Sequence, residues 1–195
     1  LGEKPPRPAL DGAADADVCI IGGGLAGLAC ALGLAERGLK PVILEGRRVG
    51  WGASGRNGGF VLAGYANSPS AIAAKVGNGQ ARDLIALTYK ALDLIKKRIA
   101  AYNIDCNPVG GHLRASWYDN ETEVKVACDK ARSFGFNTEF WPRDRVRQAC
   151  RTERYYDGIF YPDYFHMHPL AYVHGIATAC ELRGGKIFED SMALS

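Results

Sequence analysis

The sequence predicts an α/β fold, with a strand–helix–strand unit near its N-terminus and part of a second, α+β unit behind it. The first observation is a β-branched strand, Asp17–Ile21, that leads into a glycine turn and an apolar helix. The second is another strand, Val42–Glu45, so that strand, helix and strand follow one another as in parallel sheets. The third is an alternating apolar pattern at His112–Tyr118, typical of a half-buried strand.

The overall composition indicates a globular protein and excludes several classes. The 24 basic and 21 acidic residues are interspersed and lack the clustered basic face of nucleic-acid-binding proteins. The apolar segment Val18–Ala35 contains five glycines, so we do not expect a membrane span. The six cysteines include no C-x-x-C pair and no metal-ligand spacing, which favours a reduced, cytoplasmic protein without a metal site. Cys19 and Cys30 fall in elements that we expect to be buried.

Three glycines after the first strand, Gly22, Gly24 and Gly27, have the G-x-G-x-x-G spacing of a dinucleotide-binding turn. In such a turn the first glycine makes the tight bend, the second lets a pyrophosphate approach the backbone, and the third lets the helix pack closely on the strand. Free backbone amides around Leu25 and Ala26 would then face a diphosphate at the positive end of the helix.

Glu45 ends the second strand, 18 residues after Gly27, where a carboxylate can accept hydrogen bonds from both hydroxyls of an adenosine ribose. Its charge would repel a 2′-phosphate, which disfavours NADP although Arg47 follows. Because strand, glycines, helix, strand and acid occur in order, nucleotide binding is expected, against the alternatives of a fortuitous glycine turn and a solvated carboxylate. These residues do not separate NAD from FAD, since both contain an adenosine ribose and a pyrophosphate.

A second glycine-rich loop, Gly50–Gly59, follows the ribose-binding position. Its amides, hydroxyl, carboxamide and guanidinium could line the far end of a long dinucleotide, where a second phosphate or a flavin ring would lie. The alternative is a flexible glycine loop. The candidate cofactor contacts within and just before this loop are Arg47, Ala53, Ser54, Arg56, Asn57, Gly58 and Gly59.

Two helices and a strand are expected in the middle of the chain. The apolar spacing predicts a helix over Ala81–Tyr102, with a buried stripe at Leu84, Leu87, Ala91, Ile95 and Ile99 and with Lys96, Lys97 and Arg98 outside it. The strand His112–Tyr118 would place Leu113, Ala115 and Trp117 on one face. Asn120 and Glu123 are typical of a capping pair for a helix that ends at Gly135.

The last part of the chain is expected to rejoin the first sheet. His166 and His168 have no third ligand and do not make a metal site. Pro169 favours the start of a helix over 170–183, and Lys186–Glu189 would return as a strand to the nucleotide-binding sheet. The predicted organisation is therefore a flexible tail (1–16), a cofactor-binding segment (17–80), part of a substrate domain (81–165) and a return to the first domain (166–195).

Segments 17–24, 44–45 and 52–59 together resemble the D-amino-acid oxidase superfamily of FAD-dependent oxidoreductases, within it the γ-glutamylputrescine oxidase-like enzymes. Softer similarity extends through 103–106, 110–114, 166–169 and 184–185. The resemblance implies a Rossmann-like FAD-binding domain with part of a substrate domain. It also implies that Gly22, Gly24, Gly27 and Glu45 hold the ADP half, and that Ser54, Arg56, Asn57, Gly58 and Gly59 hold the flavin half.

The resemblance further implies oxidation of a C–N bond in a small amine or amino acid, with hydride transfer to flavin and oxygen as the acceptor. Some relatives attach the flavin through a histidine in this loop; because Arg56 and Asn57 occupy that neighbourhood, we expect non-covalent FAD. Arg56 could stabilise negative charge on reduced flavin. No residue is identified as the catalytic base. From typical domain sizes, members of this family are expected to be about twice as long as this chain. We therefore expect the sequence to be an N-terminal fragment that ends after residue 195.

Two other functions remain open at this point. An NAD-linked dehydrogenase would share the first glycine motif but has no need of the second glycine loop. A non-catalytic nucleotide-binding subunit would be consistent with the short chain. We expect no nucleic-acid or membrane partner, and the sequence does not indicate an oligomeric state.

Overall fold

The structure is a computed structural model that describes residues 5–194, arranged as two compact units. The first unit contains the described residues up to Gly59, together with Lys96–Asn107 and the segment from Met167 onward. The second contains Phe60–Ile95 and Pro108–His166. These compact units divide the chain at residue 59, whereas the sequence placed its first domain boundary at residue 80.

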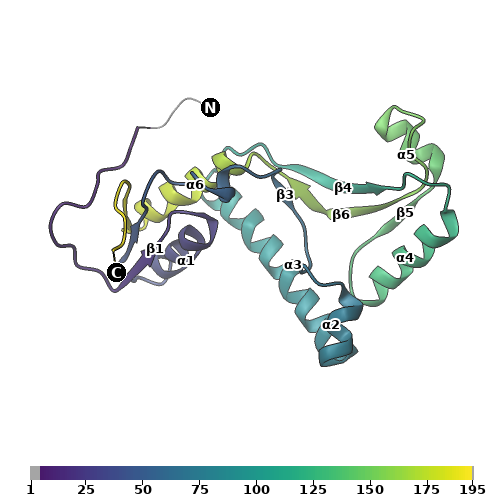
Figure 1. Cartoon of the computed structure of the whole chain (residues 1–195), viewed down its shortest axis with the longest axis horizontal. Helices are drawn as coiled ribbons and strands as arrows, with labels where there is room; N and C mark the ends of the chain where they lie inside the picture. The colour runs from purple at the N-terminus through teal and green to yellow at the C-terminus, as the bar shows by residue number, and fades with distance from the viewer. Residues whose placement is uncertain (1–4, 195) are drawn as a thin grey trace. The chain divides into compact units, whose positions relative to one another are not determined.

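The first unit is built on a parallel sheet in the order β1-β2-β7, formed by β1 (Val18–Ile21), β2 (Pro41–Leu44) and β7 (Lys186–Phe188). Helices α1 (Leu25–Ala35) and α6 (Pro169–Leu182) pack side by side in this unit (Figure 1). The core is made by fully buried side chains of these elements, such as Leu28, Leu32, Ile43 and Ile176. The return of the last strand to the first sheet is confirmed.

The expectation that β1 is a buried strand is wrong for half of its side chains. Ile21 is 74% exposed, and Cys19 and Cys30 are also exposed. The exposed residues of β1 alternate with half-buried ones, so Cys19 and Ile21 lie on the same face of the strand, and the described residues leave that face uncovered. All six cysteines are free thiols.

Local sequence signals set the helix ends of this unit. Gly38 adopts a positive φ of 83°, and the Leu39 amide donates to the Leu34 carbonyl, which closes α1 as expected. Helix α6 begins at Pro169, and the Nδ1 atom of His168 accepts from the Ala171 amide at 3.2 Å. His168 is therefore the N-cap of α6.

The segment predicted as a flexible tail makes specific contacts where the structure describes it, while residues 1–4 lie outside the described residues. The Arg7 guanidinium pairs with Glu181, and the Arg7 amide donates to Glu189 Oε2 at 2.8 Å. The Leu10 amide donates to Ser191 Oγ. These bonds tie residues 7–10 to helix α6 and to the chain that follows β7.

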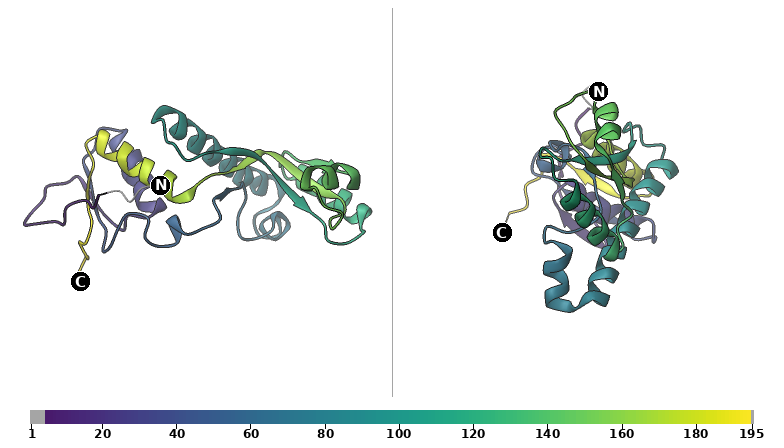
Figure 2. Two further views of the ribbon diagram at one scale, coloured as in Figure 1. Left: turned by 90° about the horizontal axis from the view of Figure 1, so that it is seen from above. Right: turned by 90° about the vertical axis from the view of Figure 1, so that its right-hand side faces the viewer.

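The second unit contains an antiparallel sheet in the order β3-β6-β4, with β5 paired to β6. Its strands are β3 (Phe60–Val61), β4 (Val109–Ala115), β5 (Glu139–Trp141) and β6 (Gly158–His166). Figure 2 shows β4 and β6 as a long, twisted pair. The helices of this unit are α2 (Pro69–Val76), α4 (Glu121–Ser133), α5 (Arg143–Cys150) and most of α3 (Asn78–Ala101).

The helix predicted at Ala81–Tyr102 exists as α3, but its buried stripe is displaced from the predicted one. Leu87 is 56% exposed, and Ala91 is exposed as well, whereas Ile85 and Leu92 are buried. The two possible stripes both have helical spacing, and the sequence alone did not decide which one faces the core.

Arg98 was expected outside the helix stripe, yet it is buried in the first unit. Its guanidinium pairs with Glu36 at 2.8 Å and also donates to the Ala29 carbonyl. Burial of a long cation is tolerated here because the charge has a partner. Burial would raise the pKa of Glu36, but its hydrogen bonds to Arg98 and Tyr102 and the Arg98 charge hold it below the ordinary value.

The predicted strand His112–Tyr118 is displaced to Val109–Ala115. Trp117 lies beyond its end and is 53% exposed. The helix after it is confirmed, but its predicted capping bonds are not: the Asn120 side chain donates to Glu123 Oε2 at 3.0 Å instead of capping the backbone. The Asn120 Oδ1 atom accepts from the Ser116 hydroxyl, which explains why it does not cap the helix.

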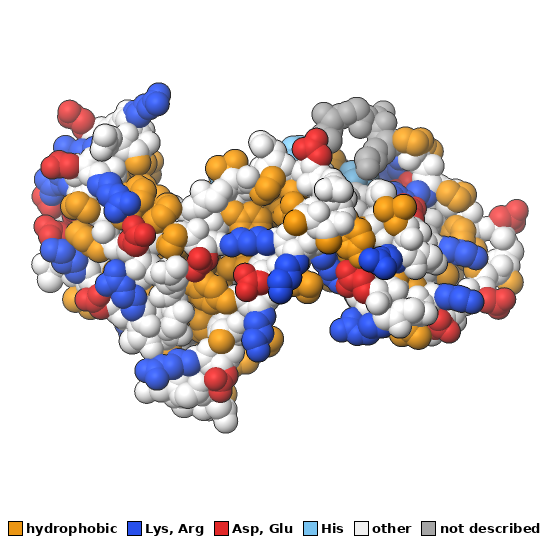
Figure 3. Space-filling model, turned by 180° about the vertical axis from the view of Figure 1, so that it is seen from behind, with side chains coloured by type: hydrophobic (Ala, Val, Ile, Leu, Met, Phe, Trp, Pro, Cys, Tyr) orange, Lys and Arg blue, Asp and Glu red, His pale blue; other side chains and the backbone are white. Residues whose placement is uncertain are grey.

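The surface carries charges of both signs. Basic and acidic side chains alternate with apolar ones over the face in Figure 3. None of the helices in the described part of the chain combines the length and apolar content that a membrane crossing requires.

Candidate functional site

The glycine turn after β1 has the backbone geometry that the sequence predicts. Gly22 has a φ of 101°, a conformation that side chains rarely allow. A Cβ atom at Gly27 would lie closer than 3.0 Å to the Gly22 carbonyl oxygen, so helix α1 could not start this close to the turn with any other residue there. Gly24 is the N-cap of α1.

The first turn of α1 presents backbone donors without acceptors. The amides of Ala26 and Gly27 find no acceptor among the described residues, as is usual for the first turn of a helix. The Leu25 amide differs from the expectation, because it donates to Ser54 Oγ at 2.9 Å. Two free donors at the positive end of a helix are suited to an anion such as a diphosphate.

Glu45 lies at the carboxyl end of β2, next to the end of β1, since Ile21 pairs with Leu44. Its Oε2 atom accepts from the Gly23 amide at 2.6 Å, and its Oε1 atom accepts from the Arg47 amide at 2.9 Å. The carboxylate is half-buried. It therefore holds the glycine turn in place, at the edge of a parallel sheet where ligands of such folds bind.

The second glycine loop is ordered by the side chain of Asn57. Its amide nitrogen donates to the carbonyls of Ala53 and Ser54 at 3.0 and 2.9 Å, and its Oδ1 atom accepts from the Gly59 amide at 2.8 Å. The Met167 amide donates to the Gly59 carbonyl, which fixes the end of the loop. These hydrogen bonds favour one conformation of the loop over the alternative of a flexible glycine loop.

The two glycine-rich motifs are in direct contact. Besides the bond between Leu25 and Ser54, a Cβ atom at Gly24 would lie 3.1 Å from Ser54 Oγ. The Gly50 amide donates to the Gly23 carbonyl at 3.1 Å. Segments more than 25 residues apart in the sequence thus form one backbone-lined site in the first unit.

Trp51 is a residue of this loop that the sequence interpretation did not single out. The guanidinium carbons of Arg47 and Arg56 lie 4.1 and 4.7 Å from the centroid of its ring, a cation–π arrangement. Trp51 and Arg56 also line a cleft of about 700 Å³ within the first unit, together with Leu170 and His174 of α6. The two predicted cofactor-binding arginines are therefore held by a shared aromatic ring.

Glu189 was predicted only as the end of a strand, and it is the most buried acidic residue described, at 1% exposure. Its Oε1 atom accepts from the Val49 amide at 2.9 Å, and its Oε2 atom accepts from the Arg48 guanidinium at 2.9 Å. Burial would raise the pKa of Glu189, but the amides of Val49 and Arg7 and the charges of Arg48 and Arg7 hold it below the ordinary value. In the sequence, the only feature that could have indicated this buried role of Glu189 was its position directly after a strand that returns to the first sheet.

The comparisons with known proteins agree with this fold and site. The model of the family DAO, described as FAD dependent oxidoreductase, matches residues 17–195, and the chain belongs to this family. A probable oxidoreductase OrdL from Haemophilus influenzae is 36% identical over 187 residues, which are 94% of this chain and 43% of that protein. Gamma-glutamylputrescine oxidoreductase from Escherichia coli is 33% identical over 188 residues, 95% of this chain and 44% of that protein.

A solved structure supports the fold independently. L-amino acid deaminase from Proteus vulgaris matches with a TM-score of 0.74 and 20% identity, over 95% of this chain and 43% of that chain. The chain thus spans less than half the length of the relatives it matches. The predicted family, the α/β fold and the dependence of the family on FAD are confirmed.

Proposed function

We propose that this chain forms the FAD-binding part of an oxidoreductase that oxidises a C–N bond in a small amine or amino acid, as a γ-glutamylputrescine oxidase-like enzyme. The observation that carries the proposal is the contact between the two glycine motifs, with the Leu25 amide bound to Ser54 Oγ. An NAD site needs only the first motif. A site continued by a second, ordered glycine loop is suited to the longer FAD molecule.

The residues proposed to hold the cofactor act through position and charge. The free amides of Ala26 and Gly27 would bind the diphosphate, and Glu45 would accept from the ribose hydroxyls while it holds the Gly23 amide. Arg56, Gly58 and the rest of the second loop would lie toward the flavin. When bound, FAD supplies the acceptor for a hydride from the carbon next to the amine nitrogen.

The cofactor proposal is tested by purifying the protein and recording its absorption spectrum. We expect a yellow protein whose chromophore, released by acid, is FAD. Release of intact flavin would support non-covalent binding, which we propose because no histidine occurs between residues 50 and 59. A colourless protein that binds NAD would contradict the proposal and favour a dehydrogenase.

The substrate and acceptor are tested separately from the cofactor. We propose a small amine as substrate, by analogy with the name of the Escherichia coli relative, and oxygen as the electron acceptor. The measurement is flavin bleaching by a panel of amines and amino acids without oxygen, followed by peroxide release on admitting oxygen. A flavin-loaded protein that no amine reduces would favour a non-catalytic subunit.

The cytoplasm is the proposed location. It rests on the six thiols, all of which are free, since paired cysteines are expected in oxidising compartments. Cell fractionation with a tagged protein tests it, and recovery from the periplasm or the medium would contradict it.

A further inference from the structure

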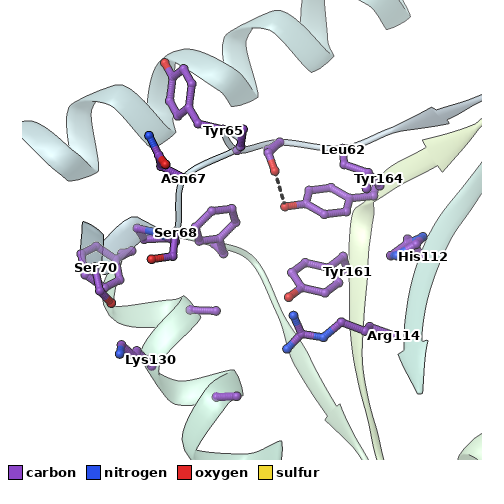
Figure 4. A pocket seen from close by; sticks show the side chains of 18 residues that line it. Leu62, Tyr65, Asn67, Ser68, Ser70, His112, Arg114, Lys130, Tyr161 and Tyr164 are labelled. Carbon is purple, nitrogen blue, oxygen red and sulfur yellow. Dashed lines mark hydrogen bonds between the residues drawn. The ribbon is translucent and has the colours of Figure 1, made fainter. Parts of the chain in front are cut away.

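The second unit contains a cleft of about 600 Å³ that is independent of the glycine motifs. Figure 4 shows that it is lined by the segment 62–70, by strands β4 and β6 and by helix α4. Its volume is in the range of sites that hold small molecules.

One wall of the cleft is held by hydrogen bonds. The Tyr164 hydroxyl donates to the Ala63 carbonyl at 3.0 Å, and the Gly64 amide donates to the Thr88 hydroxyl at 3.0 Å. The Tyr65 hydroxyl donates to the Leu84 carbonyl at 3.2 Å. The wall is therefore tied to the sheet and to α3 without any ligand.

The floor of the cleft is aromatic and lies next to an irregularity in the sheet. The register between β4 and β6 shifts between Gly110 and His112. This shift accompanies the stacking of Tyr161 on Tyr164, with ring centroids 4.7 Å apart and planes 5° from parallel. The other apolar lining comes from Leu62, Ala127, Ala131, Phe134 and Phe136.

The polar groups of the cleft are two cations, several hydroxyls, the Asn67 carboxamide and the His112 imidazole. Arg114 and Lys130 both line it, and no described Asp or Glu does. The Arg114 side chain is exposed and makes no hydrogen bond or ion pair with the residues that the structure describes, and the Tyr161 hydroxyl likewise has no hydrogen-bond partner among them. Figure 4 shows the Arg114 guanidinium and the Tyr161 hydroxyl pointing into the same space.

The protonation states of the lining groups are consistent with this description. Burial raises the pKa of Tyr161 although the nearby Arg114 charge opposes the shift, so its hydroxyl keeps its proton at neutral pH and can donate. Burial and the charges of Arg114 and His166 lower the pKa of His112. His112 is therefore neutral at neutral pH, and the positive charge of the cleft comes from Arg114 and Lys130.

We propose that this cleft binds a small amphipathic anion, in which an aromatic or apolar body lies against the tyrosine floor and a carboxylate bonds to Arg114 and the Tyr161 hydroxyl. A planar guanidinium matches a carboxylate, and a bound anion would accept hydrogen bonds from Arg114 and from the Tyr161 hydroxyl in place of solvent. The proposal does not depend on the cofactor or the reaction proposed above.

Calorimetric titration of the purified protein with 3-phenylpropionate tests the charge preference. The controls are 3-phenylpropanamide, which has the same body without a charge, and 3-phenylpropylamine, which is a cation. We expect binding of the carboxylate at least about tenfold tighter than that of the amide, since a hydrogen bond to a charged group contributes that much. Equal affinity for the amide, or tighter binding of the amine, would overturn the proposal.

Three variants assign the binding to this cleft. Arg114→Met should weaken 3-phenylpropionate binding about tenfold or more, and Tyr161→Phe, which keeps the stacked ring, should weaken it several-fold. Lys90→Met is the matched control for loss of a surface cation, because Lys90 is exposed and does not line the cleft. Circular dichroism checks that each variant is folded. Unchanged binding in Arg114→Met, or the same loss in Lys90→Met, would contradict the assignment.

Discussion

The glycine-lined site of the first unit is formed mainly by backbone groups, whereas the cleft of the second unit is formed mainly by side chains. In the first unit, backbone amides and carbonyls form the site, and glycine is required where a Cβ would meet the Gly22 oxygen. In the second, side chains such as Arg114 and Tyr161, which stand on strands of the antiparallel sheet, form the site. A backbone-built site thus restricts residue identity along one short segment, whereas a side-chain-built site restricts it at scattered positions.

The largest effect is expected from Gly27→Val, which tests whether the first site depends on backbone approach. Its side chain would have to displace the Gly22 carbonyl, so we expect a loss of about 3 kcal/mol or more in unfolding free energy and at least tenfold weaker flavin binding. Thermal unfolding and the flavin-to-protein ratio measure the two effects.

Gly79→Ala is the matched control for that variant. Gly79 lies in helix α3 with no atom within 4 Å of an added Cβ and no positive φ. Alanine there should raise stability by about 0.5–1 kcal/mol and leave flavin binding unchanged. A Gly27→Val protein that keeps its flavin would mean that the close approach is not needed for the site.

The next largest effect is expected from Glu189→Gln, which removes a buried charge that accepts a hydrogen bond from the Val49 amide, just before the second glycine loop. The variant leaves Arg7 and Arg48 without their common partner, so a loss of about 2–3 kcal/mol is expected in chemical unfolding. Glu181→Gln is the control, because Glu181 pairs with the same Arg7 but its side chain is 37% exposed; the loss in this variant should stay below about 1 kcal/mol.

The Glu189→Gln variant also tests a pH dependence of stability. Because the folded pKa of Glu189 is lowered, the stability that it supplies is present above the unfolded pKa of the carboxyl and is lost as pH falls through the folded pKa. Wild-type protein should therefore lose more stability than Glu189→Gln between neutral pH and the acid range. Parallel stability profiles of the two proteins would show that the charge of Glu189 does not stabilise the fold.

Gly111→Ala extends the comparison to the second unit. Gly111 has a φ of 87°, and an added Cβ would lie 2.7 Å from the Phe160 ring, so we expect a loss of about 1–2 kcal/mol. Gly110→Ala, one residue earlier, meets no atom within 4 Å and should cost less. Flavin binding should be unchanged in both variants. Equal losses would mean that the register shift of β4 does not require glycine.

Residues that act through the backbone were among those predicted from the sequence. Gly22 and Gly27 were assigned structural roles from spacing alone, and the structure confirms the geometry of both. Glu45 was placed correctly at the end of β2, but its bond to the Gly23 amide was not foreseen. A carboxylate that also holds a turn has the same sequence signal as one that only binds a ligand.

The features that the sequence missed depend on contacts between distant segments. Glu189 is 140 residues from Val49, and no local pattern relates them. The exposure of Ile21 depends on which face of β1 other segments cover, and strand composition does not encode that. In α3, Leu87 and Ile85 are both compatible with helical spacing, and only packing against the second unit's other elements selected Ile85.

The smallest effect is expected from Ser54→Ala, which removes the bond between the two glycine motifs. Loss of the acceptor for the Leu25 amide should cost about 1 kcal/mol of stability and weaken flavin binding several-fold. Ser68→Ala removes a similar bond, to the Ala71 amide at the start of α2 in the second unit, with a similar loss of stability. Flavin titration separates the two, since only Ser54→Ala should weaken binding. If Ser68→Ala weakened it equally, the loss would reflect general destabilisation, and the contact between the motifs would no longer support the proposed FAD site.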